Sequence, residues 1–121
     1  MLMKTNNRII VRKGTEHYPV ILDDIVLFYT ENRLTFVFTK NGTKYITDEI
    51  LSNLETMLNK EKFYRTNRQS IVNIDFIKSF RTIEKVKISV ELAVPVAKDP
   101  IIVSQDSAAT FRKWIEGKLW Q

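Results

Sequence analysis

Short runs of β-branched and aromatic residues, separated by brief polar breaks, constrain the fold of this chain more than any other feature of its sequence. Two of these runs, residues 25–29 and 34–38, flank the polar segment 30–33. Runs of this length are too short for helices, and their composition is that of strands. Asn41-Gly42 follows the second run and predicts a hairpin with a type I′ turn, which needs positive φ at both central residues. The first half is therefore predicted to consist of antiparallel strands.

Two segments have the period of a helix instead. In TDEILSNLETMLNK, residues 47–60, the apolar side chains fall on one helical face, and Thr47 or Asp48 is placed to cap its start. Ser104 is placed to cap a closing helix that ends near Gly117. Its apolar face is predicted to hold Phe111, Trp114, Ile115 and Leu119, with Trp120 beyond the end. Between the helices, the alternation over residues 86–94 and the run 101–103 predict further strands. The fold class is mainly β with two short helices, and no internal repeat is visible.

Length and composition indicate one soluble domain. The 121 residues suit a single domain, predicted at 8–117, with tails at 1–7 and 118–121. No window reaches the roughly 18 consecutive apolar residues of a membrane span, and the first residues lack the apolar stretch of a signal peptide. The chain has no cysteine, which excludes disulfides and makes a cytoplasmic location the expectation.

The reactive side chains argue against catalysis. His17 is the only histidine and stands in a predicted turn without nearby partner residues, and a Cys/His metal site is impossible without cysteine. Asp23-Asp24 is predicted to form the turn before Ile25 rather than a working pair of carboxylates. The three glycines, at positions 14, 42 and 117, build no phosphate-binding loop. No enzyme activity, metal or cofactor is expected.

Charge and loop composition favour a binding function. The net charge of +5 suits an anionic partner such as nucleic acid, although it also suits any small soluble domain. Arginine, asparagine and glutamine read base edges with paired hydrogen bonds, and they gather at three predicted strand ends. These residues are Asn32, Arg33, Arg65, Asn67, Arg68, Gln69 and Gln105. From the residues alone, recognition loops and loops that are polar because they face solvent are equal alternatives.

The segment FYRTNRQSIVN, residues 63–73, resembles the signature of the LytTR family, the DNA-binding output domain of LytR/AlgR-type response regulators. Its matching parts are Phe63, then RTNRQ at 65–69, then IVN at 71–73. Further motifs follow the family order at residues 24–25, 51–58, 77 and 102–104, so the resemblance covers nearly the whole chain. The sequence departs from the family at Asn67, where histidine is common, at Gln69, where serine is common, and at Gln105, where arginine is usual.

The resemblance implies an elongated arrangement of small antiparallel sheets whose loops, rather than a helix, enter successive major grooves of double-stranded DNA. The contact loops would be residues 30–33, 65–69 and 104–105. The family also implies paired direct repeats as the binding site, two copies on one DNA, and a receiver domain for which these residues leave no room. Because the pattern offers no dimer seam, a monomer is expected free in solution.

Individual roles can be assigned as expectations. Arg68 is the first candidate for a base or phosphate contact, and Arg33 is the second. Arg65 is expected either to contact DNA or to have a structural role, in which it stacks on Phe63 or Tyr64 or pairs with an acidic neighbour. Asn73 is expected to form a turn. Gln105 in place of arginine predicts adenine rather than guanine at the nearest base, or a phosphate contact. Candidate phosphate contacts are Lys40, Lys44, Lys60, Lys62 and Lys78.

Two alternatives remain open. A β domain can bind RNA through aromatic residues on a sheet face, but the aromatic residues available here are expected in the core. These are Tyr29, Phe36, Phe38 and Tyr45. The basic loops could instead bind an acidic protein. Three loops on one edge of the structure, about one major-groove spacing apart, would favour DNA, and scattered loops would favour the protein-interaction module.

Overall fold

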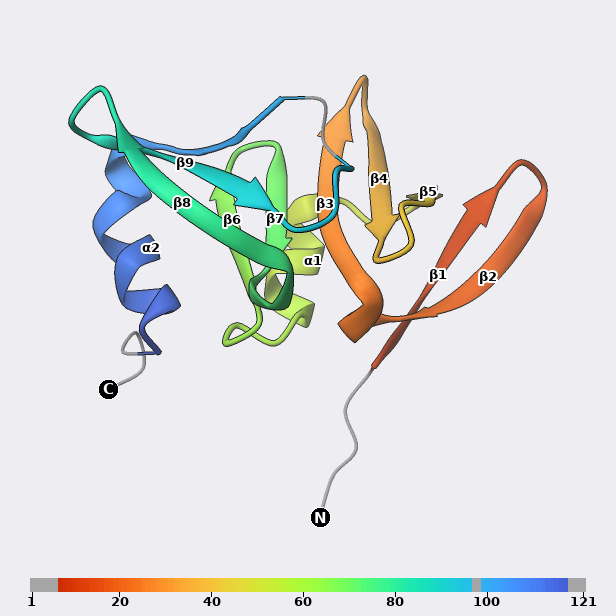
Figure 1. Cartoon of the computed structure of the whole chain (residues 1–121). Helices are drawn as coiled ribbons and strands as arrows, with labels where there is room; N and C mark the ends of the chain where they lie inside the picture. The colour runs from red at the N-terminus through yellow and green to blue at the C-terminus, as the bar shows by residue number, and fades with distance from the viewer. Residues whose placement is uncertain (1–6, 97–98, 118–121) are drawn as a thin grey trace, which may run out of the picture.

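Hairpins and short helices follow one another along the chain, and Figure 1 shows their arrangement. The structure is a computed structural model that describes residues 7–96 and 99–117. The strands are β1 (Arg8–Lys13), β2 (Glu16–Ile21), β3 (Ile25–Glu31), β4 (Leu34–Thr39), β5 (Lys44–Thr47), β6 (Phe63–Asn67), β7 (Ser70–Asn73), β8 (Ile77–Ile83), β9 (Lys87–Leu92) and β10 (Ile101–Val103). The helices are α1 (Leu51–Met57) and α2 (Ala108–Ile115), and short 3-10 turns occupy Leu22–Asp24, Ile74–Phe76 and Gln105–Ser107.

The strands form two antiparallel sheets. The larger has the order β2-β1-β5-β4-β3-β7-β6, and the smaller has the order β10-β9-β8. The prediction of a mainly β fold of antiparallel sheets with two short helices is thus confirmed. The larger sheet is wide because β3 pairs with β7 and so joins the strands of the first half to the β6–β7 hairpin.

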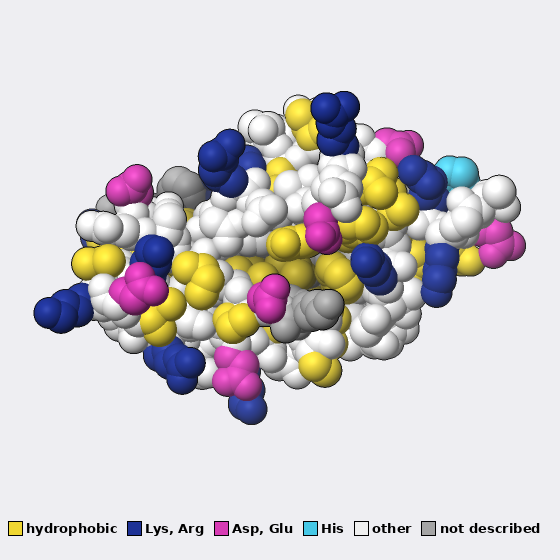
Figure 2. Space-filling view, turned by 90° about the horizontal axis from the view of Figure 1, so that it is seen from above, with side chains coloured by type: hydrophobic (Ala, Val, Ile, Leu, Met, Phe, Trp, Pro, Cys, Tyr) yellow, Lys and Arg dark blue, Asp and Glu magenta, His cyan; other side chains and the backbone are white. Residues whose placement is uncertain are grey.

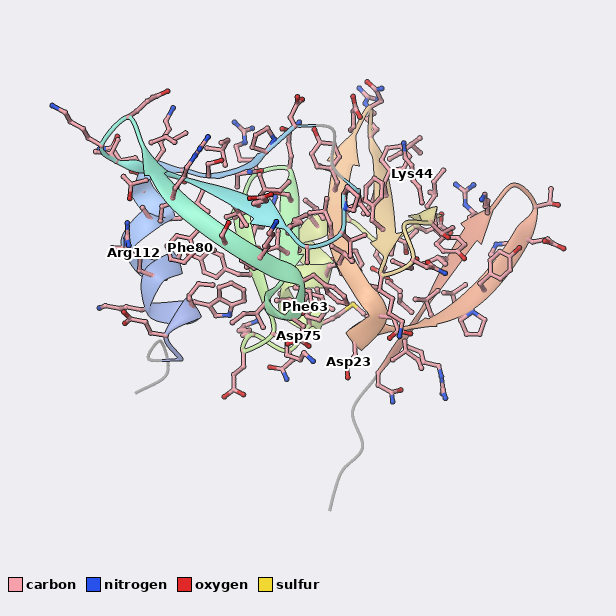
Figure 3. All side chains as sticks on the ribbon, in the orientation of Figure 1. Asp23, Lys44, Phe63, Asp75, Phe80 and Arg112 are labelled. Carbon is pink, nitrogen blue, oxygen red and sulfur yellow. The ribbon has the colours of Figure 1, made fainter. Side chains whose placement is uncertain are left out.

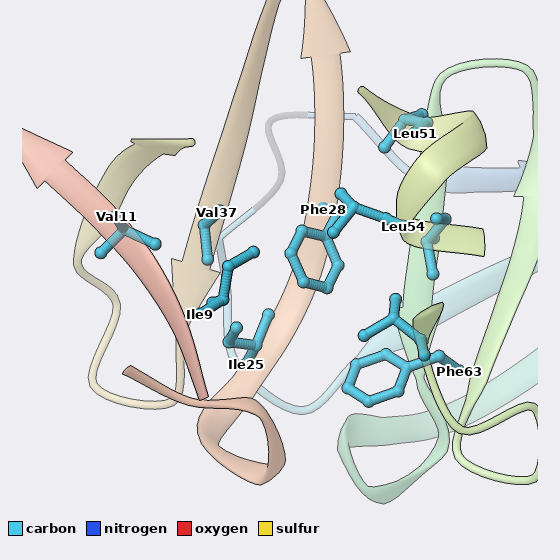
Figure 4. Packing of buried hydrophobic residues seen from close by; sticks show 10 residues of the cluster. Ile9, Val11, Ile25, Phe28, Val37, Leu51, Leu54 and Phe63 are labelled. Atoms are coloured by element: carbon cyan, nitrogen blue, oxygen red, sulfur yellow. The ribbon is translucent and has the colours of Figure 1, made fainter. Parts of the chain in front are cut away.

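Strand β3 lies between two hydrophobic clusters. Ile25 and Phe28 belong to the first, which α1 and Phe63 enclose (Figure 4). Val26 and Leu27 belong to the second, which contains residues of β9, β10 and α2. Burying each such side chain contributes about 1.5–3 kcal/mol, so this strand is a rigid base for the turn that follows it. Leu54, Ile71 and Val72 are also buried in these clusters, and Ile77 and Phe80 are half-buried against the second.

Both predicted helix starts are wrong. Helix α1 begins at Leu51 after an extended Ile50, and the Thr47 hydroxyl accepts instead from the Glu49 N–H at 3.4 Å. Ser104 precedes a 3-10 turn without a side-chain bond to it, and α2 begins at Ala108. Short polar side chains favour local turns as readily as helix caps, which explains both errors. The predicted positions of Leu119 and Trp120 lie outside the described residues.

The turns also differ from expectation. The Asn41-Gly42 hairpin exists, but its connection is longer than two residues, and only Gly42 has positive φ, at 84°. The pair with positive φ is Asn32-Arg33, at 54° and 67°, which forms the two-residue connection between β3 and β4. His17 lies in the edge strand β2 opposite Arg12, rather than in a turn.

The order of elements repeats along the chain, so the expectation of no internal repeat is wrong at the level of structure. The first half runs β1–β2 hairpin, 3-10 turn, β3–β4 hairpin, β5 and α1; the second runs β6–β7 hairpin, 3-10 turn, β8–β9 hairpin, β10 and α2. The pairing repeats as well, because β4 pairs with β5 and β9 pairs with β10. In addition, β5 pairs with β1, and β10 lies against β6.

Equivalent residues of the two halves stand at one constant offset along the chain. The pairs are Asp23 and Asp75, Ile25 and Ile77, Phe28 and Phe80, and Arg33 and Lys85. In both β3 and β8 the pairing register shifts between the first and third residues of the strand. The repeat escapes a sequence comparison because few of the side chains agree, while backbone turns and bulges are kept.

Lys62 ties the two halves together at equivalent positions. Its ammonium lies 3.2 Å from an oxygen of Asp23 and 2.7 Å from one of Asp75, the carboxylates labelled near the lower edge in Figure 3. The hydrogen bond to Asp75 is the main cause that raises the pKa of Lys62, and the bond to Asp23 adds to it, while burial opposes both.

Candidate nucleic-acid interface

The β3–β4 turn carries the first polar tip. Asn32 and Arg33 are both exposed, and their positive φ values are those of a type I′ turn, which matches the twist of the flanking strands. Within residues 7–96 and 99–117, no side-chain hydrogen bond or ion pair holds the Arg33 guanidinium. The tip therefore presents an uncompensated cation to solvent.

Arg65 shapes the second tip, the β6–β7 turn, from inside. One guanidinium nitrogen donates to the Arg68 carbonyl at 2.7 Å, and Nε donates to the Asn67 carbonyl at 3.2 Å. The third nitrogen lies 3.2 Å from a Glu55 carboxylate oxygen on α1. The alternative that Arg65 pairs with an acidic neighbour is thus what the structure contains, and its donors hold the turn.

Asn67 joins the second tip to β10, the strand that precedes the third tip. Its amide nitrogen donates to the Ile102 carbonyl of β10 at 2.7 Å, and its amide oxygen accepts from the Gln69 N–H at 2.8 Å. Both ends of the amide are engaged inside the protein. Arg68 and Gln69, the two residues of the turn itself, are exposed, and neither side chain has a partner in the described part of the chain.

The third tip is the connection from β10 to α2. Gln105 is exposed there, at the start of the 3-10 turn. Tyr64 supports this connection through two contacts. Its ring stacks on the Trp114 ring with the centroids 5.0 Å apart, and its hydroxyl donates to the Ser107 carbonyl at 3.4 Å. Burial raises the pKa of the Tyr64 phenol, and the bond to Ser107 opposes that shift. Trp114 is fixed in turn by its indole N–H, which donates to the Lys60 carbonyl at 2.9 Å.

The three tips lie along one edge, the upper edge in Figure 1. The Thr30 N–H donates to the Gln69 carbonyl at 2.9 Å, which links the first tip to the second. An open groove runs between the second and third tips, and its lining includes Arg68, Gln69 and Ser104. Figure 2 views this edge from above and shows Lys and Arg side chains spread over it, with acidic side chains among them. Acidic groove residues are Glu55 and Asp106.

The predicted lysine contacts are scattered. Lys44 lies over the Phe36 ring, 4.2 Å from its centroid, on the face of β4 and β5. Lys40 pairs with Asp24 at 3.3 Å. It follows Thr39, which lies opposite Ile25 at the start of β3, whereas the first tip follows the end of β3. The length of β3, about 20 Å, therefore separates Lys40 from the first tip. Lys78 pairs with Glu91, and Lys62 holds the two halves as described.

Asn73 has the structural role expected of it. Its amide donates to the Ile25 carbonyl at 2.8 Å and accepts from the Asp75 N–H at 2.9 Å, and the residue is completely buried. The aromatic side chains considered for RNA stacking are half-buried. They are Tyr29, Phe36, Phe38 and Tyr45.

One groove residue escaped the sequence reasoning. Lys87, at the start of β9, lines the groove beside the second and third tips and pairs with Glu84 at 3.6 Å. The sequence signal for a turn here is the polar pair Glu84-Lys85, which separates two apolar stretches. The alternation over residues 86–94 instead predicts that Val86 belongs to a strand. Val86 instead lies in the turn, where its N–H donates to the Ile83 carbonyl at 3.2 Å.

These features define a small antiparallel β domain that presents exposed polar turns along one edge. A family model for the LytTr DNA-binding domain matches residues 15–116, and the chain belongs to that family. The resemblance noted in the sequence is thereby confirmed, and the chain is a DNA-binding domain.

A solved structure supports the fold assignment. The chain is similar to the LytTr DNA-binding domain of a Bacillus cereus protein described as a putative methyl-accepting/DNA response regulator. The TM-score is 0.80 at 21% sequence identity, over 91% of this chain and 97% of the other. No curated protein matched the sequence. No helix in the described part of the chain is long and apolar enough to cross a membrane.

Proposed function

We propose that this chain is the output domain of a bacterial two-component response regulator and regulates transcription by binding duplex DNA at a specific sequence. The observation that carries the proposal is the meeting of three exposed polar tips on one edge. Each tip ends in side chains that read bases or bind phosphates, and none of Arg33, Arg68 or Gln105 has a side-chain partner in the described residues. Tips on one edge suit insertion into the major groove, whereas scattered loops would not.

The side chains divide into two roles. Arg33, Arg68, Gln69 and Asn32 are free to contact bases or phosphates. Arg65 and Asn67 also belong to the interface, but their hydrogen bonds are made within the protein, so they position the turn rather than read the DNA. Lys44 is a candidate phosphate contact at the side of the edge, while Lys40 faces away from it.

Gln105 sets a preference at the third tip. Glutamine pairs best with the adenine edge, whereas arginine in that place would pair with guanine. We expect adenine, or a phosphate contact without base preference, at the nearest position of the site. Selected sites with guanine there, and loss of that preference in Gln105→Ala, would contradict this role.

The assembly follows the family. Two copies of the domain would occupy a pair of direct repeats on one DNA, and the free domain would be a monomer. A receiver domain in the same regulator, in the cytoplasm, would control binding.

Binding-site selection from random duplex DNA at about 150 mM salt, with single-stranded RNA as competitor, tests the proposal, because salt of this order suppresses weak phosphate binding. Recovery of paired short repeats, lost in Arg68→Ala, is the expected result. Lys40→Ala is the matched control at the opposite edge and should select the same sites. Preferential recovery of RNA would favour the RNA alternative, and recovery of nothing would favour an acidic protein partner.

A further inference from the structure

The structural repeat gives the first tip, the β3–β4 turn, a counterpart in the second half of the chain. This counterpart is the β8–β9 turn, a fourth turn beside the three tips. Residues Glu84, Lys85 and Val86 connect β8 to β9, one residue more than the Asn32-Arg33 connection between β3 and β4, and the first two stand at the positions equivalent to Asn32 and Arg33. Both turns follow a seven-residue strand that begins after a 3-10 turn. Figure 1 shows the β8–β9 turn on the same upper edge as the β3–β4 turn, at the other end of that edge.

Two consecutive residues of this fourth turn have positive φ, as both residues of the first tip do. Glu84 has φ 50° and Lys85 has φ 70°, both in the left-handed region. A non-glycine residue pays for that conformation with strain, and such strain is concentrated at functional sites. Neither residue has the short amide side chain that adopts the conformation readily, so the turn keeps a long cation where glycine or asparagine would be more stable.

Charge at the turn points the same way. Lys85 is exposed and has no ion pair in the described residues, like Arg33. Lys87 stands two residues further on and lines the groove that also holds Arg68, Gln69 and Ser104. Its side chain is 43% exposed, and Glu84 holds it at 3.6 Å. A cation therefore lies both at the end of the edge and inside the groove.

We propose that the β8–β9 turn is a fourth DNA contact, in which Lys85 binds a backbone phosphate beyond the bases that the three tips reach and Lys87 binds one beside the groove. The inference rests on the proposed function, because it extends the same edge. A lysine is a mobile point charge that holds phosphate without reading a base. The fourth turn thus lengthens the footprint and adds affinity but no sequence preference.

The test compares the salt dependence of duplex binding in wild type, Lys85→Asn and Lys113→Gln. Asparagine accepts positive φ, so Lys85→Asn keeps the turn while it removes the charge. Lys113→Gln removes an exposed lysine from α2 that does not line the groove, and it serves as the matched control. Thermal unfolding of each variant checks that the fold is retained.

Loss of one phosphate contact lowers the slope of log K against log salt by about 0.9. We expect that change for Lys85→Asn on the selected site and on unrelated duplexes alike, with base preference unchanged. The slope should be unchanged for Lys113→Gln. Equal slopes for wild type and Lys85→Asn would overturn the inference and leave the proposed function intact. Equal losses in both variants would also overturn it, since they would report net charge alone. A wild-type domain that binds no duplex DNA would refute both proposals.

Discussion

Replacing Arg33 by glycine should move stability and DNA binding in opposite directions. Arg33 occupies the second position of the β3–β4 turn at φ 67°, and a glycine placed directly after Asn32 completes the Asn-Gly pair that type I′ turns prefer. Most substitutions at a binding site that weaken binding leave open whether the fold has been damaged. This one separates the two effects by sign.

The expected stability change follows from the backbone. The left-handed conformation costs an ordinary residue about 1–2 kcal/mol, and glycine avoids that cost. Glycine loses more conformational freedom on folding than arginine does, which lowers the stability by roughly 0.5–1 kcal/mol. The net result is a domain between unchanged and about 1 kcal/mol more stable, because the Arg33 side chain makes no hydrogen bond or ion pair in the described residues that would be lost. Its melting temperature should rise by at most about 5 °C.

The expected binding change is larger and opposite. Loss of a good paired contact to a base costs about 1–3 kcal/mol, which is about 5- to 150-fold in Kd. Fluorescence anisotropy on the selected duplex measures Kd, and calorimetry measures the melting temperature of the same samples. Arg33→Lys separates the roles further, since lysine keeps a phosphate contact but lacks the fork that pairs with guanine.

Two results would refute the reasoning about Arg33. A melting temperature several degrees lower in Arg33→Gly would mean that the guanidinium stabilises the fold. An unchanged Kd in a stable variant would mean that the first tip does not reach the DNA.

Three further predictions concern other residues. Asn67→Ala should weaken DNA binding and also lower the unfolding free energy by about 1–3 kcal/mol, because it leaves the half-buried Ile102 carbonyl without its donor; an effect on binding alone would assign Asn67 to direct contact. Gln105→Arg should shift the selected base nearest the third tip toward guanine, as sequencing of selected sites would show, and an unchanged site would remove Gln105 from the reading residues. Lys62→Met should lower stability by up to about 1 kcal/mol near neutral pH, with the loss reduced at high salt. The folded-state pKa of Lys62 is raised above its ordinary 10.5, so its contribution to stability is complete below that pH and disappears as the pH rises further. The unfolding free energies of wild type and Lys62→Met, measured by chemical denaturation, should therefore converge in strongly alkaline buffer. A constant difference across that range would contradict the linkage.

The fold class was within reach of the sequence because the period of the apolar residues differs between strands and helices. Runs such as residues 34–38 alternate in burial, as a strand with one buried face must. The positions of turns were harder to predict. Asn41-Gly42 has the residues of a type I′ turn, yet that backbone occurs at Asn32-Arg33, where the pairing of β3 with β4 and β7 imposes it on less suitable residues.

The residues of the candidate site could be predicted from the sequence, but their separate roles could not. Residue type marks Arg65, Asn67 and Arg68 equally, and only the packing shows that the first two are engaged within the protein while the third is free. The acceptors responsible, such as the Ile102 carbonyl, are backbone atoms distant in sequence, and no side-chain pattern announces them. Lys87 was missed for a related reason, since its nearness to the groove depends on how β9 lies against the β6–β7 turn.

The bond from Asn67 to Ile102 has a consequence for how target preference changes over evolutionary time. A turn that stands outside the sheet can exchange its residues without disturbing the ladders below, so the β3–β4 turn is free to acquire a new preference alone. The Asn67 amide links the β6–β7 turn to β10, the strand that leads into the β10–α2 connection, so a change that displaces this amide is expected to alter both tips. We therefore expect relatives to vary independently at Asn32 and Arg33, but to change Asn67 together with residues near Gln105. New DNA targets would then arise by single substitutions at the first tip and by joint substitutions at the second and third tips.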